Sequence, residues 1–330
     1  MNRYPYLYLG AEGVRRALPM AAAIEAMVEA FRELAAGGAS MPPRTKLSVP
    51  GGSGTVLLMP SFSSSQRRLA LKFLTLYENN RSLGLPLIQA LVILADAESG
   101  SPLAILDGAA LTALRTGAVS GAATAVLARP NACRAAIFGG GTQARAQLEA
   151  VYAVRPLVEA RVFDSNVGAA AAFAGEMGER LGLTVRPVPD AASALREADI
   201  VCTATTARDP VFDDRDLASG THINAVGVYQ PERAEIPPST VARARIVVDQ
   251  REAALEEAGD LLRPLAAGLI GRERFDVELG DVLLRRVSGR RADDEITLFK
   301  SVGLAVQDLF AASRAYVNAL TQGIGLELPR

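Results

Sequence analysis

The stretch Arg134–Ala144, RAAIFGGGTQA, decides the fold. An apolar run ends in three glycines, and a stretch of helical character follows over residues 143–154. Gly139, Gly141 and Ala144 fit the pattern G-x-G-x-x-A. A tight glycine turn lets backbone N–H groups approach a pyrophosphate, and the N-terminus of the next helix favours its charge. This stretch therefore predicts the strand, turn and helix that open a dinucleotide-binding domain.

A second strand is predicted at residues 160–164, ARVFD, and it ends in Asp164. A carboxylate at this place accepts hydrogen bonds from a ribose diol. Asp164 comes 25 positions after Gly139, slightly later than the usual ~20. Ser165 and Asn166 follow it instead of an arginine, so we expect NAD(H) to be favoured, with NADP(H) left open. The alternative is a glycine-rich turn that only packs a helix on a sheet.

Predicted strands and helices alternate from residue 134 to about residue 249. Such alternation indicates an α/β fold with a Rossmann-type, doubly wound parallel sheet and right-handed crossovers. Helices are predicted over residues 167–182 and 190–197. The predicted strands are AAIFG, ARVFD, TVRPV, DIVCTAT, THINAVG and RIVVD.

The first third of the chain has a different pattern. A predicted helix at residues 19–36 precedes five strand-like runs within 41–106, which suggest an antiparallel sheet or small barrel. Residues 111–128 turn helical, and a final helix is expected near 298–320. We therefore predict an α+β, sheet or barrel-like domain over residues 1–115, with a C-terminal helix at 305–330 packing back on it. Residues 116–304 form the Rossmann domain.

Composition excludes several classes of function. The net charge is -1, which gives no electrostatic reason for binding nucleic acid or an anionic membrane. No apolar stretch approaches the ~20 residues that span a bilayer. The first residues lack the basic start and apolar core of an export signal, so we expect a cytoplasmic protein. Cys133 and Cys202 are expected to be buried thiols.

His222 is the only histidine. A histidine-based metal site and a Ser-His-Asp triad elsewhere are thereby nearly excluded, and we predict no metal. His222 lies in the apolar run GTHINAVG and is expected to be a hydrogen-bonded structural residue. Acid–base chemistry must then use Lys, Arg, Asp, Glu, Tyr or water.

Three cations lie beside apolar segments: Arg44 after Pro42-Pro43, Lys72 within LALKFL, and Arg115 within LTALRTG. A lysine inside a strand is costly unless it meets water or a partner, and a guanidinium grips a carboxylate through two hydrogen bonds. Taken singly, each is explained as an exposed or salt-bridged residue. Beside a nucleotide-binding fold, they indicate an anion pocket for an amino or imino acid. Tyr229 follows another predicted strand, as a structural ring or a group facing the nicotinamide.

These residues carry a resemblance to a known family. Over nearly its whole length the chain is similar to the ornithine cyclodeaminase/μ-crystallin family, which includes cyclodeaminases, an alanine dehydrogenase branch and imine reductases. The matching stretches are MPPR (41–44), LMP (58–60), LKF (71–73), LTALRTGA (111–118), GGGTQA (139–144), ADIVCTAT (198–205), HINAVG (222–227) and EITLFKSVGLAVQDL (295–309).

The resemblance implies a homodimer made by the sheet domain, which also binds the substrate. It implies that Arg44, Lys72 and Arg115 hold the substrate carboxylate, with Lys72 and Arg115 as the catalytic pair and Lys72 as candidate proton donor. Thr142 and Gln143 would cover the pyrophosphate. The other residues implied near the cofactor are Thr116, Gly139, Gly141, Ala144, Asp164, Ser165, Thr205, Val226, Gly227, Tyr229 and Val302.

Two departures from the family pattern bear on activity. Ornithine cyclodeaminases carry an aspartate where this chain has Tyr229, and a glutamate where it has Leu57. Without both carboxylates, a base and a partner for a second ammonium are missing. A tyrosine suits the imine-reductase branch better. The leading hypothesis is therefore an NAD(P)H-dependent reductase of 2-imino acids, such as Δ1-pyrroline-2-carboxylate giving L-proline. The alternatives are an ornithine or lysine cyclodeaminase using NAD⁺ catalytically, another amino-acid dehydrogenase, and a non-enzymatic, crystallin-like nucleotide-binding protein.

Overall fold

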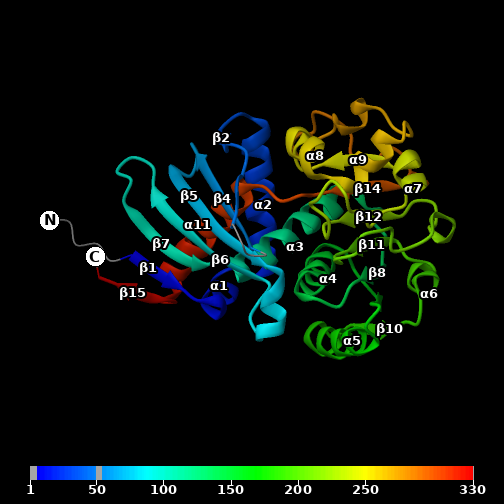
Figure 1. The fold of residues 1–330 in the computed structure, drawn as a ribbon, viewed down its shortest axis with the longest axis horizontal. Coiled ribbons are helices and arrows are strands. Elements are labelled where there is room, and N and C mark those ends of the chain that lie inside the picture. Colours follow the sequence, from blue (N-terminus) through cyan, green and yellow to red (C-terminus); the bar gives the residue numbers. More distant parts are fainter. Residues whose placement is uncertain (1–5, 50–53, 330) are drawn as a thin grey trace. The chain divides into compact units, whose positions relative to one another are not determined.

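The chain passes twice between two structural units in the computed structural model, which describes residues 6–49 and 54–329 (Figure 1). Unit 1 comprises residues 1–115 and 304–330, and unit 2 comprises residues 116–303. The first passage falls inside helix α3 (Gly108–Leu127), and the second falls just before helix α11 (Ala305–Gln322).

Unit 1 is built on an eight-stranded sheet in the order β15-β1-β7-β6-β5-β4-β2, with β3 also paired to β4. Successive pairs from β2 and β3 through β7 are antiparallel, whereas β1 runs parallel to β7. The strands are β1 (Tyr6–Leu9), β2 (Ala39–Ser40), β3 (Thr45–Ser48), β4 (Gly54–Ser63), β5 (Arg68–Tyr77), β6 (Ile88–Asp96), β7 (Pro102–Asp107) and β15 (Leu326–Leu328).

The two faces of this sheet have different surroundings. Along β5, Ala70, Lys72 and Leu74 are buried, whereas the alternate residues Leu69 and Phe73 are exposed, as the two-residue period of a strand requires. Helix α11 packs along β4, β5 and β6 and against α2 (Met20–Ala35), so these helices cover the buried face (Figure 1). The short helices α1 (Ala11–Ala17) and η1 (Glu78–Leu83) complete unit 1.

Unit 2 contains a seven-stranded sheet in the order β10-β9-β8-β11-β12-β14-β13, and every pair in it is parallel. The predicted Rossmann-type, doubly wound sheet is therefore confirmed. The order reverses between β8 and β11, and ligands bind beyond the carboxyl ends of the strands at such a point. The strands are β8 (Arg134–Phe138), β9 (Glu159–Phe163), β10 (Thr184–Pro187), β11 (Ile200–Thr203), β12 (His222–Ala225), β13 (Arg245–Val248) and β14 (Thr297–Lys300).

Two apolar clusters form the core of unit 2. Strands β11, β12 and β14 are buried throughout, as strands of a parallel sheet covered on both faces are. Phe138 and Ile223 belong to one cluster, and Ile137 and Phe173 to the other. The helices are α4 (Thr142–Val154), α5 (Val167–Leu181), α6 (Ala191–Leu195), α7 (Pro238–Arg243), α8 (Arg251–Glu257), α9 (Gly259–Ala266) and α10 (Leu279–Leu283), with the short η2 (Asp214–Asp216) and η3 (Arg272–Phe275).

The prediction for the C-terminal region was wrong in two respects. Residues 297–300 form β14 and not the start of a helix, because the apolar run TLFK is buried between β12 and β13. The last helix starts at Ala305 and ends at Gln322, where the N–H of Gly323 bonds to the carbonyl of Ala319. Residues 326–328 then pair with β1, so the expected helix over 305–330 stops eight residues early.

The structure also tests three expectations about individual residues and about helix α3. Helix α3 is long and apolar enough to cross a membrane, contrary to the expectation, but 78% of its most apolar window is buried, as in a core helix.

Cys202 is buried but Cys133 is only half-buried, and both are free thiols. The structural role expected of His222 is confirmed: it is fully buried, with Thr297 Oγ1 at 2.9 Å and Asn224 Oδ1 at 3.2 Å. Burial lowers its pKa to about 3.

The glycine turn after β8 gives the first testable prediction. Gly139 has φ 101°, and a Cβ there would lie 2.7 Å from the Ala204 carbonyl oxygen. We expect Gly139→Ala to lower the free energy of unfolding by at least ~1–2 kcal/mol, because an L residue is strained at such a φ. Gly141→Ala is the matched control: its φ is −86° and its Cβ would meet open space. Equal stability of the two variants in urea unfolding would contradict the prediction.

Candidate functional site

A buried ion cluster lies between β5 and α11 of unit 1. Lys72, on the inner face of β5, is 1% exposed, and its Nζ lies 2.6 Å from Oδ2 of Asp308 in the first turn of α11. The other oxygen, Oδ1, accepts a hydrogen bond from Arg115 Nε at 3.2 Å. One carboxylate therefore holds two cations that the sequence separates by 43 positions.

Gln307 provides a second contact to Arg115. Its Oε1 accepts from Arg115 Nη1 at 2.6 Å and from the backbone N–H of Leu304 at 3.1 Å. The guanidinium is thus held by two adjacent residues of α11. Gln307 is fully buried, and its Nε2 has no hydrogen-bond partner within the described part of the chain. These two contacts fix the orientation of Arg115 and leave its other N–H groups for a ligand.

The cluster has an excess of positive charge. Burial lowers the pKa of Lys72 to about 8; Asp308 opposes this fall, while Arg115 and Arg44 add to it. Arg44, in the loop between β2 and β3, is therefore within electrostatic reach of Lys72. Lys72 and Arg115 face one carboxylate, which leaves a formal charge of about +1 when Lys72 is protonated. A ligand carboxylate would reduce the mutual repulsion, so the cluster suits an anion.

The glycine turn of unit 2 has the features of a nucleotide site. Gly141 is the N-cap of α4, and no side chain caps this end, so its first N–H groups face outward. Thr142, Gln143 and Ala144 form the first turn of α4, and Ala144 is fully buried. The small third residue lets helix and strand approach, as the pyrophosphate-binding pattern requires. An NAD(H) pyrophosphate fits this helix end.

Asp164 closes the same turn from β9. Its Oδ2 accepts from the backbone N–H of Gly140 at 2.7 Å, and its Oδ1 accepts from that of Asn166 at 2.8 Å. A carboxylate has about four acceptor positions, so two contacts leave capacity for a ribose diol. Ser165 follows directly, and Asn166 caps α5 through the N–H of Ala169. The adenosine end of an NAD(H) molecule is therefore also accommodated.

The residues expected beside the nicotinamide come from one edge of the unit 2 sheet. They follow the carboxyl ends of three neighbouring strands, β11, β12 and β14. Val302 is buried, and Tyr229 is half-buried against an apolar cluster. Thr116 lies on α3, where its carbonyl accepts from Gln147 Nε2 at 3.1 Å. The residues after the three strands are Thr205, Val226, Gly227, Tyr229 and Val302.

Sequence reasoning missed several buried polar residues. Besides Gln307 and Asp308, these include Asp249, whose Oδ2 accepts from the N–H groups of Val302 at 2.7 Å and Gly303 at 3.0 Å. A signal was present, since Asp249 ends the predicted strand RIVVD as Asp164 ends ARVFD. Gln307 and Asp308 gave no such signal, because polar residues in a helix are usually exposed.

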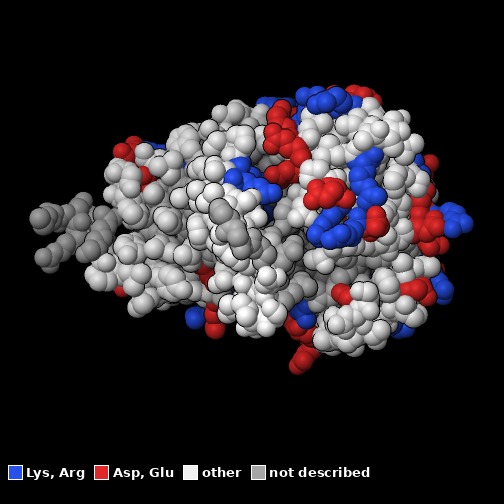
Figure 2. Space-filling model, viewed as in Figure 1, with Lys and Arg blue, Asp and Glu red and all other residues white. Residues whose placement is uncertain are grey.

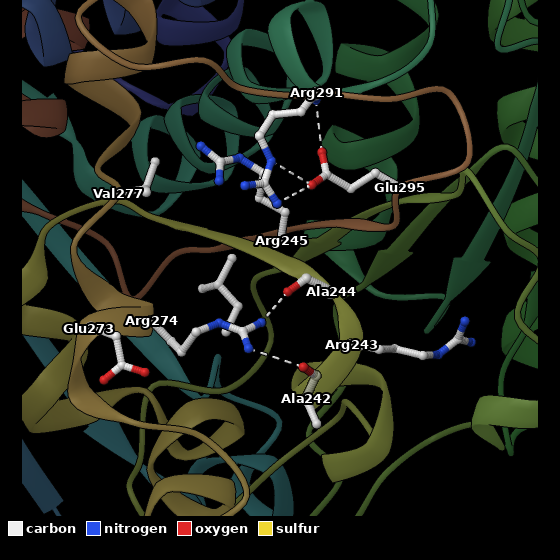
Figure 3. A pocket seen from close by; sticks show the side chains of 10 residues that line it. Ala242, Arg243, Ala244, Arg245, Glu273, Arg274, Val277, Arg291 and Glu295 are labelled. Atoms are coloured by element: carbon white, nitrogen blue, oxygen red, sulfur yellow. Dashed lines mark hydrogen bonds and ion pairs between the residues drawn. The ribbon is translucent and has the colours of Figure 1, made fainter.

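A separate cavity of about 360 Å³ lies at the opposite edge of the unit 2 sheet, where β13 begins (Figure 3). Arg245 donates to the carbonyls of Gly289 and Ser288, Arg274 donates to that of Ala242, and Arg291 pairs with Glu295. Arg245 and Arg274 thus satisfy backbone carbonyls and Glu295 neutralises Arg291, so we assign the cavity no role in catalysis. Within the described residues, no three His, Cys, Asp or Glu side chains are placed to hold a metal.

Comparison with known proteins identifies the family. Residues 7–323 match the model of the ornithine cyclodeaminase/mu-crystallin family, and the chain belongs to this family. A Δ1-pyrroline-2-carboxylate reductase of Bacillus cereus (strain ZK / E33L) is 40% identical over 320 residues, 97% of this chain and 98% of the relative.

Two solved structures have nearly the same fold. One is the Δ1-pyrroline-2-carboxylate reductase of Thermococcus litoralis in complex with NADH and L-proline, with a TM-score of 0.94 and 40% identity over 98% of this chain and 100% of that one. The other is an archaeal alanine dehydrogenase dimer with bound NAD, with a TM-score of 0.92 and 36% identity over 98% of this chain and 99% of that one.

The ion cluster gives the second prediction. Asp308→Asn leaves Lys72 and Arg115 without their carboxylate, and breaking a buried pair in this way costs about 3–5 kcal/mol of stability. The double variant Lys72→Met, Asp308→Asn should regain part of that stability but no affinity for an imino acid. Glu25→Gln is the control. Glu25, on α2, forms an ion pair at the surface with Arg314, which lies on α11 as Asp308 does.

The Asp308→Asn variant should also change the pH dependence of kcat/KM. If the Lys72 ammonium attracts the substrate carboxylate, kcat/KM should fall as the pH rises through about 8, where Lys72 loses its proton. Asp308→Asn removes the contribution that raises the pKa of Lys72, so this limb should move to lower pH. Initial rates across the pH range measure it, and an unmoved limb would contradict the assignment.

Proposed function

We propose that this chain is an NAD(P)H-dependent reductase of 2-imino acids, with NADH favoured and a cyclic imine such as Δ1-pyrroline-2-carboxylate as substrate, giving L-proline. The observation that carries the proposal is the buried cluster of Lys72, Arg115 and Asp308, which has spare positive charge for one carboxylate. The glycine turn and Asp164 support the nucleotide part. The similarity to reductases of this substrate in Bacillus cereus and Thermococcus litoralis supports the choice of imine.

Each residue group has a defined task in this proposal. Arg44, Lys72 and Arg115 bind the carboxylate of the imino acid and so orient its C=N bond. When bound, NADH supplies the hydride to the imine carbon. The reduction also consumes a proton, and Lys72 or a water that it orients delivers it to the imine nitrogen. A lysine with a pKa near 8 holds this proton at neutral pH and releases it readily.

The cofactor is held by unit 2 in this proposal. The turn Gly139–Gly141 and the first turn of α4, with Thr142, Gln143 and Ala144, bind the pyrophosphate. Asp164, beside Ser165, accepts hydrogen bonds from the adenosine ribose, and its charge disfavours a 2′-phosphate. The nicotinamide is bordered by Thr116, Thr205, Val226, Gly227, Tyr229 and Val302.

Tyr229 and Leu57 favour reduction over cyclodeamination. A cyclodeaminase must remove a proton at the amino carbon and bind a second ammonium, and both tasks call for a carboxylate. An ordinary tyrosine hydroxyl has a pKa of ~10 and is a poor base at neutral pH. Leu57 is a buried apolar residue of β4.

We propose that the chain forms a homodimer through the exposed face of the unit 1 sheet. Cross-strand partners on this face are apolar: Leu58 pairs with Phe73, and Phe73 with Leu91. Figure 2 shows few charged side chains over β5 to β7 on the drawn side. A continuous apolar face of this kind marks an interface, and the dimeric alanine dehydrogenase relative favours a second copy as the occupant. The exposed apolar side chains are Leu58, Phe62, Leu69, Phe73, Leu91 and Ile93.

The activity is tested with a substrate panel followed by NADH absorbance and ammonia release. We expect NADH oxidation with Δ1-pyrroline-2-carboxylate or its six-membered homologue, and negligible ammonia from L-ornithine with NAD⁺. NADH should exceed NADPH in kcat/KM by at least about ten-fold, ~1.4 kcal/mol. Tyr229→Phe should keep much of the activity, because the ring mainly shapes the pocket. Efficient ornithine deamination by the unaltered protein would overturn the proposal.

The dimer is tested by charge insertion. Phe73→Glu places a carboxylate at the centre of the apolar face, where pairing with a second copy would bury it at high cost. We expect this variant to elute as a single 34.7 kDa chain in size exclusion with light scattering. Val317→Glu, an exposed apolar residue of α11, is the matched control and should remain dimeric. A dimeric Phe73→Glu variant would place the interface elsewhere.

A further inference from the structure

Glu235 lies fully buried in unit 2, in the segment between β12 and α7. Its carboxylate accepts three hydrogen bonds. Oε1 accepts from the backbone N–H of Thr205 at 2.7 Å, and Oε2 accepts from the N–H of Gly227 at 2.9 Å and the hydroxyl of Thr203 at 3.1 Å. Thr203 is the last residue of β11, Thr205 follows this strand, and Gly227 follows β12. One side chain therefore ties two neighbouring strand ends together.

The space around this carboxylate is closely fitted. A Cβ at position 227 would lie 2.5 Å from both oxygens of Glu235, so the contact requires a glycine. Without Glu235, two partly buried backbone N–H groups beyond the strand ends would lose their acceptor, and such groups are costly to leave unpaired.

A second layer holds Glu235 itself. Asp260, on α9, accepts from the backbone N–H groups of Glu235 at 2.6 Å and Ile236 at 3.0 Å. Its Oδ2 lies 2.7 Å from Nζ of Lys300 at the end of β14, and Lys300 donates to the Val228 carbonyl at 2.6 Å. Glu235, Asp260 and Lys300 are all fully buried. The chain of contacts joins β11, β12 and β14 at the edge where the order of the sheet places a ligand.

We propose that Glu235 is a positioning residue for cofactor binding: its carboxylate fixes the backbone of Thr205 and Gly227 beside the nicotinamide. The inference rests on the proposed function for the presence of the nicotinamide at this edge. Glu235 acts through these backbone groups and touches neither ligand. Neither the motifs shared with the family nor the local sequence pattern assigns a role to Glu235.

The network also has one more negative than positive charge. Burial raises the pKa of Glu235 to about 7; Asp260 adds to the rise and Lys300 opposes it. Because this pKa exceeds the ordinary 4.5, ionisation of Glu235 costs stability, and the free energy of unfolding should fall as the pH rises from about 4.5 to about 7. The affinity for NADH should change in the opposite sense, since the ionised carboxylate is the better acceptor for the strand-end N–H groups.

The test measures the dissociation constant of NADH by fluorescence, together with KM for the imine and the melting temperature. Glu235→Gln has the same size but turns an N–H₂ toward backbone donors. We expect its dissociation constant to rise about ten-fold at pH 8, with KM for the imine changed less than about two-fold. Glu235→Asp, which keeps the charge, should be affected less. Glu278→Gln is the control. Glu278 is a half-buried glutamate that, like Glu235, accepts a backbone N–H, that of Arg251, and its substitution should change binding less than about two-fold.

The unaltered protein supplies an independent measurement if the variants do not fold. Its NADH affinity should rise between about pH 6 and about pH 8.5, and Glu235→Gln should lose this dependence. A pH-independent affinity in the unaltered protein would overturn the inference, as would a folded Glu235→Gln variant with unchanged NADH binding. If the variant binds NADH and the imine equally weakly, Glu235 only stabilises the fold, and the inference is wrong. An unaltered protein that binds no NADH would overturn the proposed function instead.

Discussion

The carboxylate of Asp308 stabilises the two cations buried in unit 1, Lys72 and Arg115. A buried lysine and a buried arginine cannot share a dry environment unless an opposite charge and hydrogen bonds compensate them. Asp308 compensates both, with one oxygen for Lys72 and the other for Arg115. Gln307 from the same helical turn completes the hold on Arg115. One carboxylate cannot neutralise two cations, so a positive charge remains in the cluster. A substrate carboxylate would neutralise this remaining charge.

Unit 2 uses carboxylates in a different way. At the carboxyl edge of a parallel sheet, the segments that leave the strands carry backbone N–H groups without a strand partner. Asp164, Asp249 and Glu235 each accept two or more hydrogen bonds there, and most of the donors are backbone N–H groups. These side chains fix the loops whose geometry a nucleotide requires. The conformation of the loops at this edge therefore depends on the three carboxylates that accept their backbone N–H groups, and not on the loop residues alone.

Much of the architecture followed from local patterns. The glycine turn, the acid after the second strand and the alternation of strands and helices were sufficient for the parallel sheet, and all six strands predicted in that region exist. The pattern misled at residues 297–304, where a short apolar run could be either helix or strand. Only its burial between β12 and β13 settles it as a strand.

The sequence by itself determined the fold class, the glycine turn and the three cations, because these depend on residue type, spacing and hydrophobic period. It could not show that Gln307 and Asp308 meet Arg115, or that Glu235 meets Thr205 and Gly227. Those contacts join positions from 8 to more than 190 residues apart, and no local pattern encodes them. Tertiary structure decided which polar residues are buried, and burial is what turns an ordinary carboxylate, lysine or glutamine into a positioned group with an altered pKa or an unpartnered donor.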